Sequence, residues 1–276
     1  MKRILVIGLS GQVGEALLPG LLARGTPILA LSRQTRALLP GVSWLAGSLE
    51  VMPELPPDID AVLSLGPLDA FAAWLATARP IPRVIAIGST GRVDKLHSPD
   101  PAERELAQRL AAAEERLFEV GAGHGSAVTV LRPTLLYGNG RDRTLSRLLA
   151  LGRRWGFLVL PATATGLRQP VHVADVADAV LRCLESAQSS GQAYDLPGGE
   201  TLPFNAMVRR MLERRAPGCR LLTLPGIVFT LLLSAAAMLG RAPVNRGLLV
   251  RLNRDQLADA GAARQAFGYC PRRFEP

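Results

Sequence analysis

Three glycines near the start of the chain have the spacing needed to bind a phosphate group. Gly8, Gly11 and Gly14 follow a short apolar run and open a segment with helical apolar spacing, in the pattern G-x-x-G-x-x-G. The first glycine allows a tight turn, the second lets the backbone approach the phosphates, and the third lets helix and strand pack closely. The helix dipole and free N–H groups then face an anion. These residues predict a dinucleotide pyrophosphate site; a turn that serves packing alone is the alternative.

Alternating strand and helix patterns must position this turn, and they predict a parallel sheet with helices on both faces. Strands are expected at residues 3–8, 27–32, 43–46, 61–65, 83–88 and 127–132. Helices are expected at residues 12–24, 68–78, 101–120, 145–155, 173–186 and 204–214. Pro19 should kink the first helix or end its first half. The fold class is therefore α/β, a Rossmann-type doubly wound sheet.

The chain is long enough to bury a large core, with 276 residues of which 48% are hydrophobic. A strand follows directly after residues 1–3, so we expect no signal peptide and a cytoplasmic protein. The cysteines Cys183, Cys219 and Cys270 are odd in number and widely spaced. Neither a disulfide framework nor a metal site is expected from them.

The formal net charge of +9 comes almost entirely from arginine, because Lys2 and Lys95 are the two lysines of the chain. This balance favours acidic partners such as nucleotides, nucleic acid or anionic lipid, although an arginine-rich composition explains it as well. No basic run is interleaved with aromatic residues, as a single-strand binding groove requires. We therefore expect no nucleic-acid partner.

The segment 221–240 contains no charged residue over 20 positions, the length of a membrane span. Pro225 and Gly226 interrupt it, and the shorter remainder suits a buried or interfacial helix better. A helix covering the substrate-binding part is the favoured interpretation. A membrane-surface contact through 221–240 and a true span are the alternatives.

The order of motifs resembles the short-chain dehydrogenase/reductase superfamily, in its extended, NAD-dependent epimerase/dehydratase-like branch. The resemblance rests on the glycine turn and on four later segments. These are Val84-Ile-Ala-Ile-Gly-Ser89-Thr90, Leu131-Arg-Pro133-Thr-Leu-Leu-Tyr137-Gly138, Arg168-Gln-Pro-Val-His172-Val-Ala-Asp175-Val-Ala and Ala266-Phe-Gly-Tyr269-Cys-Pro271. It implies a dinucleotide-binding domain over 1–138, joined again by 168–195, and a smaller C-terminal substrate-binding part made of 139–167 and 196–276.

The resemblance also implies which residues hold the cofactor. An NAD-preferring relative carries an acidic residue after the second strand, whereas this chain has Arg33 there and Arg36 a turn later. A guanidinium pairs well with a 2′-phosphate, so NADP is preferred over NAD; a solvated Arg33 is the alternative. The expected cofactor contacts are Gly8, Ser10, Gly11, Gln12, Val13, Gly14, Ser32, Arg33, Leu65, Gly66, Ser89 and Pro133.

The proton relay that the family uses is missing. Family members pair a tyrosine with a lysine four residues later, beside a strand-end hydroxyl, so that the lysine lowers the tyrosine pKa. Ser89 and Thr90 supply the hydroxyls and are the catalytic candidates. If Glu114 aligns with the family's acidic residue, Leu106 and Leu110 stand where the pair should be.

Other groups are candidates to replace the relay or to bind a substrate. Asp94, Lys95 and His97 lie in the loop after Ser89, and His97 titrates near neutrality, although a loop histidine is commonly solvated. Tyr137 is a candidate at the next strand end, with local packing as the alternative. Arg168 and His172 belong to the substrate side, where an arginine can hold a phosphate or carboxylate. A purely structural role for Arg168 and His172, in which they only join the two domains, explains their positions equally well.

Two functions are therefore in competition. The first is an NADP-dependent oxidoreductase or sugar-nucleotide epimerase/dehydratase-like enzyme acting on a small-molecule or nucleotide-linked substrate. The second is a non-catalytic NADP-binding sensor or assembly protein, which the absent pair favours. A homodimer is compatible with the apolar face of Leu106, Leu110 and Leu117, although packing on the chain's own sheet explains that face as well.

Overall fold

The computed structural model describes residues 2–142, 144–238 and 247–276, and it describes no side chains over 233–249. Residues 239–240, the end of the uncharged segment 221–240, lie outside the described residues.

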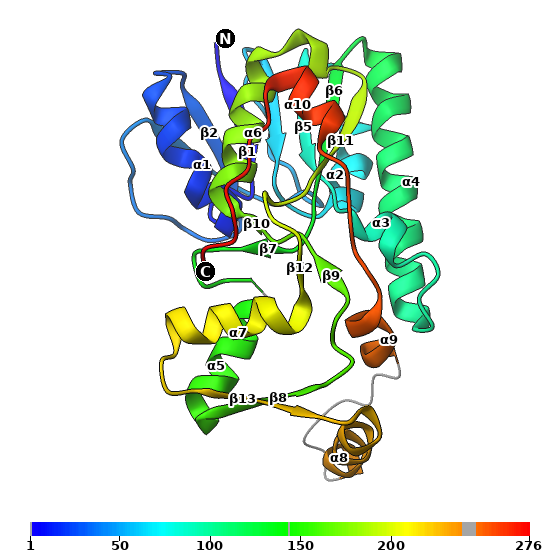
Figure 1. Cartoon of the computed structure of the whole chain (residues 1–276). Coiled ribbons are helices and arrows are strands. Elements are labelled where there is room, and N and C mark those ends of the chain that lie inside the picture. The colour runs from blue at the N-terminus through cyan, green and yellow to red at the C-terminus, as the bar shows by residue number, and fades with distance from the viewer. Residues whose placement is uncertain (1, 143, 239–246) are drawn as a thin grey trace.

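A seven-stranded parallel sheet forms the centre of the larger part (Figure 1). Its strand order is β11-β6-β5-β4-β1-β2-β3, with parallel pairing throughout. The strands are β1 (Ile4–Ile7), β2 (Ile28–Ser32), β3 (Val42–Ala46), β4 (Ala61–Ser64), β5 (Arg83–Ile87), β6 (Ala127–Pro133) and β11 (Gln192–Leu196). The expected Rossmann-type sheet is confirmed.

Burial explains why these segments form central strands. Every residue of β1, β2 and β4 is buried, because helices cover both faces of the sheet. The side chains of Ile4 and Val6 enter one core and those of Leu5 and Ile7 the opposite one. This alternation gives the sheet a separate hydrophobic core on each face.

Helices from distant parts of the chain cover each face. On one face lie α1 (Gln12–Ala23), α6 (Val173–Glu185) and α10 (Gly261–Phe267); on the other lie α2 (Leu68–Leu75) and α4 (Pro101–His124). The short α3 (Gly91–Asp94) precedes α4. Leu117 of α4 is fully buried in the core of its own sheet, whereas Leu106 and Leu110 are half-buried.

Helix α1 continues through Pro19, so the expectation that Pro19 might end its first half is wrong. A proline removes one backbone donor from the helix. Leu17 and Leu21, before and after it, are both fully buried against the sheet. Packing on each side of Pro19 therefore offsets the lost hydrogen bond.

The smaller C-terminal part has its own core beyond the carboxyl ends of the strands (Figure 1). It contains α5 (Leu145–Trp155), β8 (Phe157–Pro161), α7 (Phe204–Arg215), β13 (Arg220–Leu224), α8 (Gly226–Met238) and α9 (Gly247–Asn253). Three two-stranded sheets pair β7 (Leu136–Tyr137) with β10 (Val171–His172), β9 (Leu167–Arg168) with β12 (Leu202–Pro203), and β8 with β13. Among the described helices, none has both the length and the hydrophobicity that crossing a membrane requires.

The last residues of the chain connect the two parts. The Tyr269 hydroxyl donates to the Pro197 carbonyl at 2.8 Å, and Arg272 Nε pairs with the Asp175 carboxylate at 2.7 Å. Phe274 is buried in the C-terminal core. The motif around Tyr269 therefore fastens the chain end across both cores.

Candidate active site

The glycine turn has the geometry that close approach of a ligand requires. Gly8 has φ +86°, which disfavours any side chain. A Cβ at Gly14 would lie 2.3 Å from the Leu9 carbonyl oxygen, and one at Gly11 would lie 3.1 Å from the Gly8 carbonyl oxygen. Gly11 N–H donates to that same Gly8 carbonyl at 2.9 Å. Each of the three glycines is thus required by the turn itself.

The start of α1 meets the requirements of a pyrophosphate site. The N-cap residue Gly11 provides no side-chain cap, so the first-turn amides keep their positive field toward the turn. The side-chain oxygen of Gln12 is buried without a hydrogen-bond partner among the described residues. An amide at that position can turn its N–H groups toward a phosphate. These residues fit a dinucleotide.

The other expected cofactor residues reach the same edge of the sheet. A Cβ on Gly8 would lie 3.1 Å from the carbonyl carbon of Leu65, so Leu65 and Gly66 border the turn. Thr90 N–H donates to the Pro133 carbonyl at 3.3 Å. The ends of β1, β4, β5 and β6 therefore form one continuous border, as parallel strands require.

Two arginines follow the end of β2. The buried Ser32 hydroxyl donates to the Gln34 carbonyl at 2.8 Å and accepts Arg36 Nε at 3.3 Å. Arg33 is exposed beside it. Anchoring at Nε leaves the terminal nitrogens of Arg36 available to a ligand. The pair supplies positive charge where the ribose of a dinucleotide would lie, and the carboxylate of Glu50 is near enough to interact with the charge of Arg33.

Arg141 joins the turn from a distant segment that the sequence analysis did not select. Its Nη1 donates to the Ser10 carbonyl at 2.9 Å and to Glu15 Oε1 at 2.6 Å. Asn139 Nδ2 donates to the Gln12 carbonyl at 3.4 Å. The loop after β7 therefore crosses the glycine turn. The sequence around Gly138 predicts a turn, but it does not predict that Arg141 of this loop contacts the glycine turn.

The strand-end hydroxyls lie beside the expected nicotinamide position. Ser89 Oγ accepts the Gly91 N–H at 3.1 Å and thereby starts α3. Thr90 is buried. Both residues directly follow β5, so the sheet holds their backbone in place while α3 carries the next residues toward the C-terminal part.

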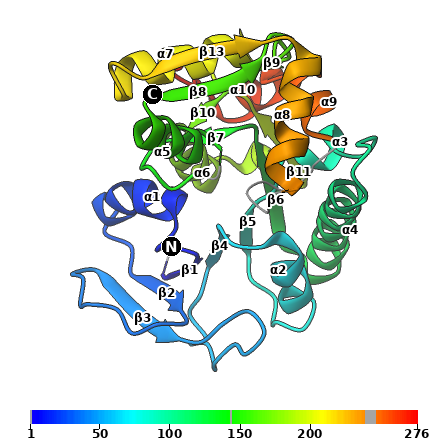
Figure 2. The ribbon, with the colours of Figure 1, turned by 90° about the horizontal axis from the view of Figure 1, so that it is seen from below.

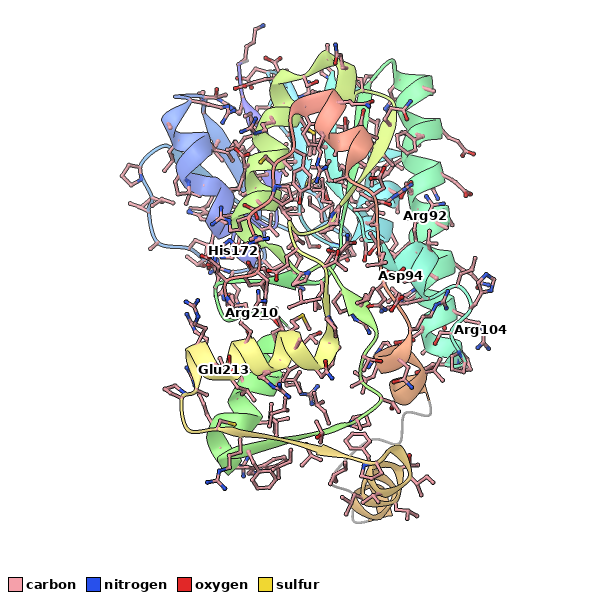
Figure 3. The ribbon with its side chains drawn as sticks, viewed as in Figure 1. Arg92, Asp94, Arg104, His172, Arg210 and Glu213 are labelled. Carbon is pink, nitrogen blue, oxygen red and sulfur yellow. The ribbon has the colours of Figure 1, made fainter. Side chains whose placement is uncertain are left out.

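Asp94 lies at the end of α3 and is half-buried. Figure 3 places it on the side of α3 that faces β9 and α9. Burial raises the pKa of the Asp94 carboxyl, and the Thr90 hydroxyl and the charges of Arg254 and Arg168 offset part of that rise. The aspartate therefore keeps its proton to a higher pH than an exposed one. Its contact with Thr90 brings an acid to the strand-end hydroxyl.

The helix that should carry the tyrosine and lysine instead supports a buried ion-pair network. Glu114 of α4 is buried and accepts Arg92 Nη1 at 2.5 Å and Arg132 Nε at 2.9 Å. Arg132 Nη1 lies 3.5 Å from Asp195. This network joins α3, α4, β6 and β11 beneath the strand-end hydroxyls, and Leu110 packs one turn earlier in the sheet core.

The two candidate histidines, His97 and His172, do not form a group with Asp94. His97 is exposed in the loop after α3. Figure 3 shows His172 and Asp94 on opposite sides of the sheet edge. His172 Nδ1 accepts the Ala174 N–H at 3.1 Å and caps α6, and burial together with Arg272 lowers the pKa of its imidazole. The ring therefore stays neutral at physiological pH.

Tyr137 and Arg168 use their polar groups within the protein. The Tyr137 hydroxyl donates to the Arg273 carbonyl at 3.3 Å and accepts the Glu275 N–H at 3.2 Å, and burial raises its pKa. Arg168 is buried, lies over the Phe204 ring and donates to the Leu167 and Arg254 carbonyls at 2.8 and 2.7 Å. Burial lowers the pKa of Arg168 to about 10. Both residues fix the chain around the site.

A hollow of about 640 Å³ lies away from these groups, between the segment 49–55 and α2. Leu49, Glu50, Trp74 and Thr77 line it, and none of the strand-end groups reaches it. We place the candidate site at the strand ends because the glycine turn, the hydroxyls and Asp94 meet there.

Comparisons with known proteins agree with this geometry. The model of the NAD dependent epimerase/dehydratase family matches residues 68–196. The 2-alkyl-3-oxoalkanoate reductase of Stenotrophomonas maltophilia (strain K279a) is 26% identical, covering 98% of this chain and 95% of its own. The Escherichia coli (strain K12) protein named YbjS, uncharacterized, is 24% identical over 60% of this chain. This chain spans about half of YbjS, 52% of its length.

Similarity extends to the fold of the whole chain. The solved structure of MoeE5 in complex with UDP-glucuronic acid and NAD has a TM-score of 0.71 at 20% identity, covering 99% of this chain and 94% of its own. The seven-stranded sheet and this structural similarity confirm the expected fold, and the family match over residues 68–196 agrees with the resemblance that the motifs predicted.

Proposed function

We propose that this chain, which resembles the extended, epimerase/dehydratase-like branch of the short-chain dehydrogenase/reductase superfamily, is an NADP-dependent oxidoreductase or epimerase-like enzyme. The glycine turn beside Ser89, Thr90 and Asp94 carries this proposal, because it places a cofactor site next to groups able to exchange a proton. The substrate is a small or nucleotide-linked molecule. It would lie between the strand ends and the smaller C-terminal part that contains α5, α7 and α8.

The cofactor side of the proposal rests on charge. Arg33 and Arg36 follow β2, and a guanidinium binds a phosphate through two parallel hydrogen bonds. Arg141 lies over the glycine turn, where its ion pair with Glu15 balances its charge. NADP would bind with its pyrophosphate at α1 and its 2′-phosphate between Arg33 and Arg36. When bound, it supplies hydride transfer, and the protein positions and polarises the substrate.

Asp94 is the group that we assign to proton exchange in place of the missing tyrosine. A carboxyl group whose pKa is raised by burial can donate a proton to a substrate oxygen and take one back. Thr90, in contact with Asp94, would orient the same oxygen. His97 is exposed, which makes it less suitable for a protected proton transfer.

A non-catalytic NADP-binding protein is the second candidate. Leu106 and Leu110 cannot exchange protons, and Arg168, His172 and Tyr137 already have partners within the protein. In this alternative, Asp94 and Thr90 only support the junction of the two parts. A sensor or assembly partner would then bind the cofactor without turnover.

Turnover separates the two candidates. We would measure NADPH oxidation against a panel of carbonyl and sugar-nucleotide substrates, with Asp69→Asn as a control because Asp69 is an exposed carboxylate on α2. The enzyme proposal expects turnover that falls at least about a hundredfold in Asp94→Asn, within the usual range for loss of a general acid. Tight NADPH binding without turnover on any substrate would favour the second candidate.

A further inference from the structure

The far end of the C-terminal part exposes a group of large apolar side chains. They come from the end of α5, from β8 and β13, and from α8, which form the end opposite the seven-stranded sheet (Figures 1 and 2). We call the set the apolar end face: Trp155, Phe157, Leu222, Ile227, Val228, Leu231 and Leu232. Ile227 is 78% exposed, Leu231 65% and Trp155 56%.

Strand register explains why the β8–β13 pair has an apolar outer surface. Residues in register share a face, so Val159 and Leu222 lie together, and Phe157 lies two residues before Val159 on the same face. The alternate residues Leu158 and Leu160 are buried in the C-terminal core. The sheet therefore covers the core with one face and presents apolar side chains to solvent with the other.

Helix α8 presents a second apolar surface at this end. Ile227, Val228, Leu231 and Leu232 follow the spacing i, i+1, i+4 and i+5, which places them on one side of a helix. Phe229 points to the opposite side and is buried. A surface helix normally places polar residues on its exposed side. Several exposed apolar side chains on one side of a helix are typical of an interaction site.

Arginines lie at one side of this end, in the last turns of α5 and α7 and at the start of β13. Arg153, Arg154, Arg214, Arg215 and Arg220 are all exposed. No acidic residue occurs in the sequence from 214 to 254, a stretch that includes α8. Exposed apolar side chains next to a group of arginines match an anionic lipid surface, where apolar side chains enter the acyl boundary and arginines meet headgroups.

We propose that the apolar end face docks on the surface of an anionic lipid bilayer. A second copy of the chain is a poorer partner, because a two-fold contact places the same patch against itself. Residues 145–161 and 214–254, which form most of that patch, contain no acidic residue to pair with the arginines. Docking lies in the plane of the membrane, since no described helix has the length and hydrophobicity to cross it. This proposal does not depend on turnover at the candidate active site.

Sedimentation with vesicles tests the proposal on the full chain. We expect the protein to sediment with vesicles of phosphatidylglycerol and phosphatidylcholine, less with phosphatidylcholine alone, and less as salt rises, because salt screens the arginines. Ile227→Ser/Leu231→Ser should lower partitioning about tenfold or more by removing buried apolar area. Arg154→Gln/Arg220→Gln should lower it about tenfold on anionic vesicles, since each arginine adds to the attraction.

The matched control is Leu38→Ser/Val51→Ser, whose side chains are 97% and 75% exposed on the sheet-containing part. It should sediment like the unaltered chain. Circular dichroism confirms that each variant is folded. The proposal is overturned if the unaltered chain stays in the supernatant with anionic vesicles at low salt, or if the control loses as much binding as the end-face variant. Self-association that Ile227→Ser/Leu231→Ser abolishes, without vesicle binding, would identify a second copy as the occupant.

Discussion

At the residue scale, one missing pair of side chains decides how the site can work. If Glu114 aligns with the family's acidic residue, two leucines stand where the resemblance places the tyrosine and lysine, and Glu114 on the same helix binds two arginines. Asp94 then becomes the acid that contacts a strand-end hydroxyl. From the sequence, Asp94 is one of three candidates in the loop after Ser89, and His97 is favoured there because its imidazole titrates near neutrality. Burial beside Thr90 is a tertiary property, and it separates Asp94 from the exposed His97.

The raised pKa of Asp94 predicts a pH dependence with a definite sign. If the protonated carboxyl donates to the substrate oxygen, kcat/KM for reduction should fall as pH rises through the raised pKa. The reverse oxidation should rise over the same window, because it needs the ionised form. Asp94→Asn should remove this pH dependence from both the reduction and the reverse oxidation. Identical profiles in the variant and the unaltered enzyme would contradict the assignment.

Folding stability should respond to the same group. Because burial raises the folded-state pKa of Asp94 above its unfolded value, its contribution to stability is full at pH below the usual aspartate range. That contribution is lost as pH rises through the raised pKa. Urea unfolding of Asp94→Asn across this window should therefore show a flatter dependence on pH than the unaltered chain.

At the element scale, apolar patterns predicted the strands and the main helices well. Continuous burial on both faces makes a parallel strand such as β1 readable as an apolar run. The sequence could not predict that α1 continues through Pro19, because the compensating burial of Leu17 and Leu21 depends on the sheet. Nor could it reveal Arg141 over the glycine turn, since that contact joins residues far apart in the chain.

The glycine turn predicts a steric effect that can be measured at Gly14. Gly14→Ala would place a Cβ against the Leu9 carbonyl, so we expect a loss of about 1–3 kcal/mol in the free energy of unfolding. Weaker NADPH binding should accompany it. Gly123→Ala is the control, because a Cβ there meets no atom within 4 Å and alanine favours the helix. A Gly14→Ala variant as stable as the unaltered chain would contradict the packing role.

The ion-pair network that joins α3, α4 and β6 predicts that loss of its carboxylate lowers the free energy of unfolding. Glu114→Ala leaves Arg92 and Arg132 without their shared carboxylate, and breaking a buried pair costs about 3–5 kcal/mol. Urea unfolding measures this loss. Glu115→Ala changes the exposed neighbour on the same helix and should have little effect. Equal stability of the two variants would show that the network contributes nothing.

At the scale of the whole molecule, two cores meet along the carboxyl edge of one sheet. Tyr269 and Arg272 hold the chain end on the sheet-containing part, and Phe274 then enters the core of the smaller part, so the C-terminal motif joins the two parts. The candidate active site lies at this junction, while the apolar end face lies at the far side of the smaller part (Figure 1). This arrangement would allow the molecule to dock on a membrane while leaving its cofactor edge open to solvent.

Titration of NADPH and NADH by fluorescence tests the central claim most directly, that the glycine turn holds NADP. We predict that NADPH binds at least about tenfold more tightly than NADH, because a charged hydrogen bond to the 2′-phosphate contributes about 1.5–3 kcal/mol. Arg33→Ala should remove most of that difference, whereas Arg109→Ala, which changes an exposed arginine on α4, should preserve it. Equal affinities for the two nucleotides would contradict the assignment of Arg33, and failure to bind either nucleotide would contradict the account as a whole.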